Sequence, residues 1–105
     1  MELWIELVGI CGEACNELDE ALVASIYSYA QWCWKSPNSE TRTAVVCAFF
    51  EHLPTTPSLR RDMIHRLDQK TFIELKGAFQ YHLSSTEFQH LEHEFLEAKR
   101  QHRRS

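Results

Sequence analysis

The chain has 105 residues, of which 44% are hydrophobic and 25% are charged, a composition typical of one globular domain and not of a disordered or fibrous protein. No apolar run approaches the ~20 residues that span a bilayer, and the N-terminus lacks the basic start of a secretory signal, so we expect a cytoplasmic protein with no membrane partner. The net charge is −4 and the only dense basic run lies at residues 99–104, which argues against a nucleic-acid partner.

The charge is divided unevenly along the chain. Residues 1–53 carry eight acids and two bases, whereas residues 54–105 carry seven acids and nine bases. An acidic first half favours a basic protein as the partner, because opposite charges speed the encounter.

The first half of the chain predicts helices, since it lacks the period-two alternation of strands and the turn pairs of β-hairpins. We expect a first helix at residues 2–17, whose apolar face comprises Leu3, Leu7, Ile10, Cys11, Ala14 and Leu18. A second helix at residues 19–35 has an apolar face made of Leu22, Ile26, Tyr29, Ala30 and Cys33.

The polar break at residues 36–39 separates the second helix from a third, which we expect to run to Leu53 and to stop at Pro54. Both helices are apolar nearly all round, which predicts a buried helical hairpin at the centre of the fold. Four cysteines lie in apolar stretches, where free cysteine behaves as a small core residue: Cys11, Cys15, Cys33 and Cys47. A C-x3-C pair supplies too few ligands for zinc, so we expect no metal and no cofactor.

The second half predicts shorter helices with clear start signals. Pro57 begins a fourth helix, and Asp68 caps a fifth, which buries Phe72, Leu75, Phe79 and Leu83. A capping box of Ser84 and Glu87 starts the last helix, whose apolar positions are Phe88, Leu91, Phe95 and Ala98. Beyond residue 98 the chain becomes polar and we expect the helix to fray, which gives one helical domain at residues 1–98 and a polar basic tail at residues 99–105.

Five to six short amphipathic helices predict an all-α fold, most simply a compact bundle. The alternative is a HEAT-like stack of helical hairpins. No internal repeat is found, and this favours the bundle.

Glu51 and His52 interrupt an otherwise apolar segment at residues 44–53. A buried carboxylate has a raised pKa unless it is hydrogen-bonded, which can mark a functional site. One hypothesis is therefore a metal-dependent or acid/base enzyme that uses this pair with His65, His82 or His90. The other is structural: Glu51 fixes a neighbouring helix end and His52 caps the last carbonyls of its helix. No known catalytic motif is present, so the sequence favours a protein that is not an enzyme.

Two segments carry a resemblance, residues 29–34 with two tryptophans and residues 43–54 with an apolar-Phe-Phe-Glu-His-Leu-Pro pattern. Over about a quarter of the chain they resemble small all-helical bacterial proteins of unknown function, some of whose relatives look like immunity proteins of toxin systems. The resemblance implies stoichiometric binding of a protein partner and carries no catalytic residue.

For such a partner, a basic toxin, the binding candidates are Glu13, Glu17, Asp19, Glu20, Trp32 and Trp34. The alternative for the four acids is a solvated helix end, where Asp19 and Glu20 complement the positive N-terminus of the second helix. A homodimer formed through the tryptophan-rich region is a further hypothesis, which needs only an exposed apolar patch.

Overall fold

The computed structural model describes residues 2–104, with the side chains of residues 3–101, and this part of the chain is built from helices without a strand. The elements are α1 (Glu2–Asn16), α2 (Glu20–Trp34), α3 (Ser39–Ala48), the 3-10 helix η1 (Phe50–Thr55), α4 (Pro57–Arg66), α5 (Gln69–Glu74), α6 (Lys76–Gln80) and α7 (Ser85–Arg104). The predicted all-α class is confirmed. None of these helices is long and apolar enough to cross a membrane.

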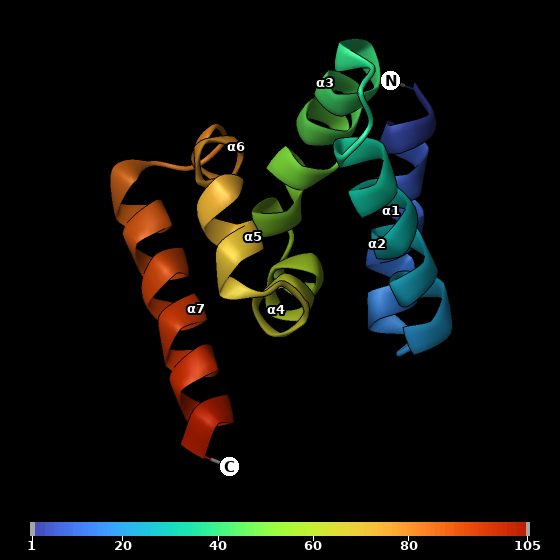
Figure 1. The fold of residues 1–105 in the computed structure, drawn as a ribbon. Coiled ribbons are helices and arrows are strands. Elements are labelled where there is room, and N and C mark those ends of the chain that lie inside the picture. The colour runs from blue at the N-terminus through green and yellow to red at the C-terminus, as the bar shows by residue number, and fades with distance from the viewer. Residues whose placement is uncertain (1, 105) are drawn as a thin grey trace.

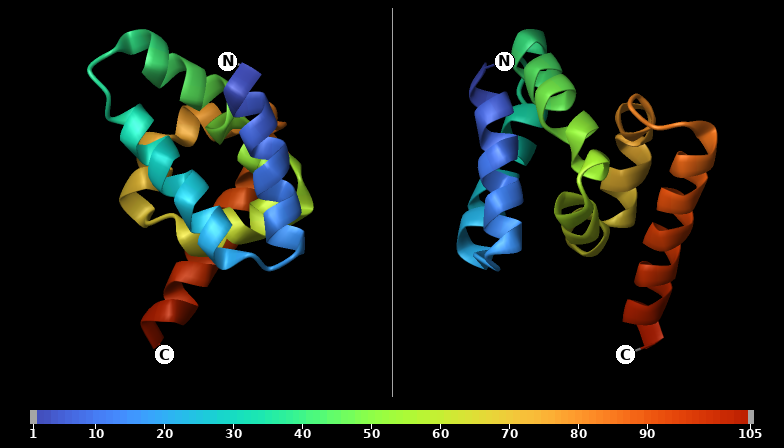
Figure 2. Two further views of the ribbon diagram at one scale, coloured as in Figure 1. Left: turned by 90° about the vertical axis from the view of Figure 1, so that its right-hand side faces the viewer. Right: turned by 180° about the vertical axis from the view of Figure 1, so that it is seen from behind.

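The chain passes from one edge of the molecule to the other (Figure 1). At the first edge α1, α2 and α3 pack against one another, η1 and α4 lie in the middle, and α7 lies at the opposite edge against α4. Views from the side and from behind show the same order (Figure 2). The α1–α2 hairpin is therefore covered on its inner side only, and its outer side faces solvent.

Side-chain caps fix the starts of α2, α5 and α7. Asp19 accepts a hydrogen bond from Leu22 N at 3.2 Å, and Asp68 accepts one from Thr71 N at 2.7 Å, which confirms the predicted cap. The predicted capping box before α7 is also confirmed, because Ser84 and Glu87 exchange two hydrogen bonds of 3.1 Å. These local signals need no tertiary context, so the sequence alone located them.

The third helix is shorter than predicted. It ends at Ala48 instead of Leu53, and after Phe49, with φ −122° and ψ −68°, the chain continues as η1. This change of direction lets the adjacent Phe49 and Phe50 both reach the core, where their rings make an edge contact at 5.3 Å. Pro54 lies inside η1, so it is not, as we had expected, the residue that ends the third helix.

The buried faces of α1 and α2 differ from the predicted faces. Three predicted core residues, Leu3, Ile10 and Leu18, are exposed, whereas Trp4 is buried in α1. In α2 the core takes Val23 and Tyr27 in place of Leu22 and Tyr29. The physical reason is that Trp4 and Tyr27 both pack on Phe49, with ring centroids 5.6 Å away in each case, and this aromatic burial sets the rotation of the two helices.

The C-terminal part differs from expectation at two points. The predicted fifth helix is divided at Leu75 into α5 and α6. The last helix does not fray after Ala98 but continues to Arg104, so most of the predicted basic tail is helical. Phe72 and Phe95 stack with centroids 4.1 Å apart and join α5 to α7 in the core.

Candidate functional site

The four acidic candidates at the end of α1 and the start of α2 are all exposed, but they differ in what they contact. Asp19 is the N-cap of α2, and Glu20 pairs with Arg66 of α4. Glu13 and Glu17 make no ion pair with any other residue whose side chain is described. Two of the four acids thus have internal roles, and two carry charge that an external partner could neutralise.

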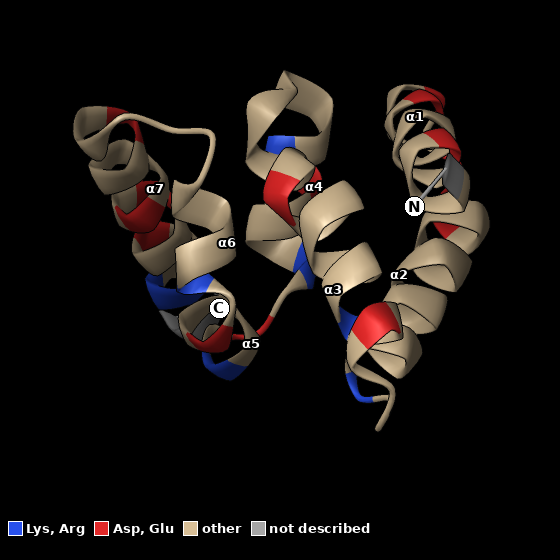
Figure 3. Ribbon diagram, turned by 90° about the horizontal axis from the view of Figure 1, so that it is seen from above, with Lys and Arg blue, Asp and Glu red and all other residues tan. Residues whose placement is uncertain are grey.

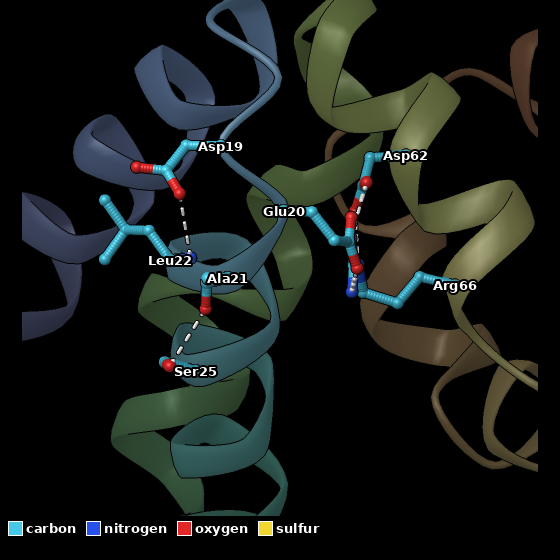
Figure 4. A network of polar contacts seen from close by, with 7 residues as sticks. All are labelled: Asp19, Glu20, Ala21, Leu22, Ser25, Asp62 and Arg66. Carbon is cyan, nitrogen blue, oxygen red and sulfur yellow. Dashed lines mark hydrogen bonds and ion pairs between the residues drawn. The ribbon is translucent and has the colours of Figure 1, made fainter.

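Arg66 of α4 contacts two carboxylates, that of Glu20 in the hairpin and that of Asp62 on its own helix (Figure 4). Its terminal nitrogens donate to both Glu20 oxygens at 2.9 and 2.7 Å, while Nε and one terminal nitrogen donate to Asp62 at 2.8 and 3.0 Å. These bonds lower the pKa of Glu20, because the guanidinium stabilises the ionised carboxylate. The link from Arg66 to Glu20 joins residues 46 positions apart, so it is a tertiary contact that the sequence did not reveal.

The same guanidinium lies over the Tyr27 ring, 5.1 Å from its centroid. The Tyr27 hydroxyl is buried and has no hydrogen-bond partner among the described residues. Burial raises the pKa of Tyr27 well above its ordinary value. The ring is therefore a structural support for Arg66, and its hydroxyl stays protonated.

The turn between α1 and α2 contains a leucine in a conformation that favours glycine. Leu18 has φ 59° and is 87% exposed. It occupies the C′ position of a Schellman motif, since Leu18 N donates to Cys15 O at 3.3 Å and Asp19 N to Ala14 O at 2.9 Å. A strained, exposed leucine beside Glu17 was not among the predicted binding residues, and nothing in the local sequence distinguishes it from a core leucine.

The tryptophan candidates separate in the same way. Trp32 is 71% exposed and stacks on Tyr29, with ring centroids 6.2 Å apart, while Tyr29 stacks on the buried Trp4 at 5.3 Å. Trp34 is half-buried and makes an edge contact with Phe50 at 6.1 Å. Trp32 thus ends an aromatic row that begins in the core and reaches solvent, whereas Trp34 supports η1.

The α1–α2 hairpin, residues 2–34, concentrates two properties. It carries six acids and no lysine, arginine or histidine, and acidic residues mark α1 in Figure 3 while the basic residues lie on other elements. It also holds seven of the ten large hydrophobic side chains that are exposed in the described part, namely Leu3, Ile5, Ile10, Leu18, Leu22, Tyr29 and Trp32. An edge that is both acidic and apolar suits association with a basic, partly apolar surface.

Glu51 and His52 meet one of the predicted histidines. The Glu51 side chain is buried, and its carboxylate lies 3.3 Å from His82 Nε2. His52 stacks on His82 with ring centroids 4.7 Å apart. Since His82 lies just after α6, this arrangement fits the structural hypothesis that Glu51 fixes a neighbouring helix end.

The surroundings of Glu51 do not favour a thiolate at the neighbouring Cys47. Burial and the neighbouring Glu51 carboxylate raise the pKa of the Cys47 thiol, so the nucleophilic thiolate is disfavoured. Burial also raises the pKa of Cys11 to about 12. All four cysteines are free, and no group of three metal-ligating side chains with suitable geometry occurs in the described part of the chain.

Comparisons of the chain with protein-family models, with curated proteins and with solved structures gave no match. The resemblance to immunity-type proteins therefore stays a prediction. The case for a function depends on the surface and contacts described above.

Proposed function

We propose that the protein is a protein-binding module whose α1–α2 hairpin docks on a basic protein. The observation that carries the proposal concerns one hairpin at one edge of the molecule. This hairpin has acidic residues but no basic ones, and it holds most of the exposed large apolar side chains. Acidic charge would steer a basic partner, and the apolar side chains would supply contact area. An immunity-type inhibitor of a basic toxin is the form of this function that we propose.

The roles within the hairpin follow from exposure and pairing. Trp32 is the expected anchor, because tryptophan often carries much of the binding energy at interfaces and the ring of Trp32 is stacked on that of Tyr29. Glu13 and Glu17 provide the charge, since they are unpaired in the described structure. Glu20 and Trp34 act indirectly, by fixing the hairpin on α4 and η1.

Affinity capture with the wild type and four variants as baits tests the proposal. The wild type is compared with Trp32→Ala and with the double variant Glu13→Lys/Glu17→Lys. The controls are Tyr81→Ala, which removes an equally exposed aromatic residue, and Glu74→Lys, which reverses an exposed acid away from the hairpin. We expect a basic protein that the wild type and both controls retain, that both hairpin variants lose, and that moderate salt releases.

The captured protein is then purified and titrated. A one-to-one complex, weakened roughly 30-fold by Trp32→Ala, is the expected result for a central anchor. If it is a toxin, addition of this protein should abolish its activity, and Glu13→Lys/Glu17→Lys should slow association more than it speeds dissociation. A stable wild-type dimer that Trp32→Ala converts into monomers would contradict the proposal and support the homodimer hypothesis.

A further inference from the structure

A hollow lies between α1, the end of α3, η1 and the start of α4. It has a volume of about 370 Å³, near the lower end of the range for small-molecule sites. Ile5 and Val8 of α1 and Leu59 of α4 form its apolar walls. None of its described lining residues is a lysine, an arginine or a carboxylate, so it offers no counter-charge to an ionic ligand.

Two polar groups in the hollow have hydrogen-bonding capacity to spare. The ring of His52 lines it, and no hydrogen bond within the described part of the chain uses a nitrogen of this ring. Stacking on His82, which Glu51 in turn holds, fixes the orientation of the His52 ring. Thr56 also lines the hollow, and although it is the N-cap residue of α4 its side chain makes no capping hydrogen bond.

Gly9 forms part of the wall in the middle of α1. Glycine inside a helix costs about 1 kcal/mol relative to alanine, so a helical glycine usually has a packing reason. Here a Cβ on Gly9 would meet no atom within 4 Å, and no described glycine has a positive φ. Packing within the molecule therefore does not require this glycine, whereas an occupant of the hollow could lie directly against its backbone.

We propose that this hollow binds a small neutral molecule built on one aromatic ring, of the phenol class. The ring would lie between Gly9 and Leu59, and its single polar atom would pair with a ring nitrogen of His52. The volume admits one ring with a small substituent. A carboxylate ligand is disfavoured because the neighbouring hairpin is acidic and has no base. This inference does not depend on the proposed protein partner.

Titration with three defined probes, p-cresol, toluene and 4-methylbenzoate, tests the inference. Methyl proton–carbon spectra report on Ile5, Val8 and Leu59. We expect saturable shifts with p-cresol and binding of toluene weaker by roughly three- to tenfold, because toluene lacks the hydrogen bond. No saturable shift is expected with 4-methylbenzoate. Absence of saturable shifts with p-cresol would overturn the proposal.

Two substitutions locate the binding. Gly9→Leu adds a Cβ that meets no atom within 4 Å and places an apolar side chain at the hollow. The protein should fold with unchanged or higher stability, because leucine favours the helix more than glycine does, while p-cresol binding weakens roughly tenfold or more. The control is Gly77→Leu in α6, where a Cβ is equally free of contacts, and it should bind p-cresol as the wild type does. His52→Phe keeps a ring against His82 and should reduce p-cresol affinity to that of toluene. Undiminished binding to a folded Gly9→Leu variant would show that the probe binds elsewhere.

Discussion

Leu18 is the only residue other than glycine with a positive φ in the described part of the chain. The left-handed conformation costs a non-glycine residue about 1–2 kcal/mol, and the exposed side chain recovers little of it by burial. We therefore expect Leu18→Gly to raise the free energy of unfolding by about 1 kcal/mol, measured by urea denaturation. Leu18→Ala is the control, since it removes the side chain but keeps the strain and should gain nothing. If the two variants behaved alike, the strain argument would fail. Weaker capture of the basic partner by both variants would give Leu18 a role in binding.

Tyr27 offers a second test at the residue scale. Its buried hydroxyl lacks a hydrogen-bond partner among the described residues, and an unsatisfied buried polar group costs about 1–3 kcal/mol. Tyr27→Phe keeps the ring beneath Arg66 and against Phe49, so we expect it to stabilise the protein by about 1 kcal/mol in thermal or urea unfolding. Tyr29→Phe, on the half-exposed ring of the hairpin, should change stability by less than about 0.5 kcal/mol. Destabilisation by Tyr27→Phe would mean that the hydroxyl has a partner such as a bound water.

At the scale of elements, the sequence predicted what local chemistry decides. The cap at Asp68, the box at Ser84 and Glu87, and the apolar side of α7 all depend on residues three or four positions apart. It failed where elements compete for the core. Leu22 and Val23 are both apolar, and the position of Phe49, between α3 and η1, determines which side of α2 turns inward. For the same reason, the sequence did not show that Glu20 and Trp34 have structural contacts and are not free surface residues. Their partners, Arg66 and Phe50, are distant in sequence.

The cap of α5 gives stability a dependence on pH. Hydrogen bonds from Thr71 hold the pKa of Asp68 below its ordinary value. That ordinary value, which applies to the unfolded chain, is about 3.9. The ionised cap therefore stabilises the fold fully above the unfolded pKa, and this contribution is lost as the pH falls through the lower folded-state pKa. Asp68→Ala should cost about 1 kcal/mol at pH 7 and less in acid. Asp68→Asn keeps an acceptor without titrating, so its stability relative to the wild type should rise as the pH falls below 4. Identical pH profiles of the wild type and Asp68→Asn would contradict this account.

At the scale of the molecule, the hairpin of α1 and α2 has helices on only one side. This position explains why the hairpin has exposed apolar residues and why contacts with α4 are needed to hold it in place. Burial on the inner side uses Trp4, Val23, Ile26 and Tyr27, whereas other large apolar side chains of the hairpin, such as Leu3, Ile10 and Trp32, stay exposed. The outer side thus remains available to a partner, while polar contacts such as those of Arg66 hold the hairpin in place. Binding and cohesion are in this way assigned to opposite sides of the same two helices.

Arg66 is the side chain whose loss should loosen that edge. Arg66→Gln removes both carboxylate contacts and leaves Asp62, itself largely buried, without its cation. We expect a loss of about 1–2 kcal/mol in the free energy of unfolding, because the pairs are bidentate but the Glu20 partner is screened by solvent. Amide hydrogen exchange should become faster first at the start of α2, because Glu20 loses its contact with Arg66, whereas the described part of α7 has no ion pair with Arg66 to lose. Arg60→Gln is the matched control: its single contact with Glu94 joins α4 to α7, and its loss should cost less than about 1 kcal/mol and leave exchange in α2 unchanged. If both variants quickened exchange uniformly over the molecule, Arg66 would contribute to global stability without anchoring the hairpin.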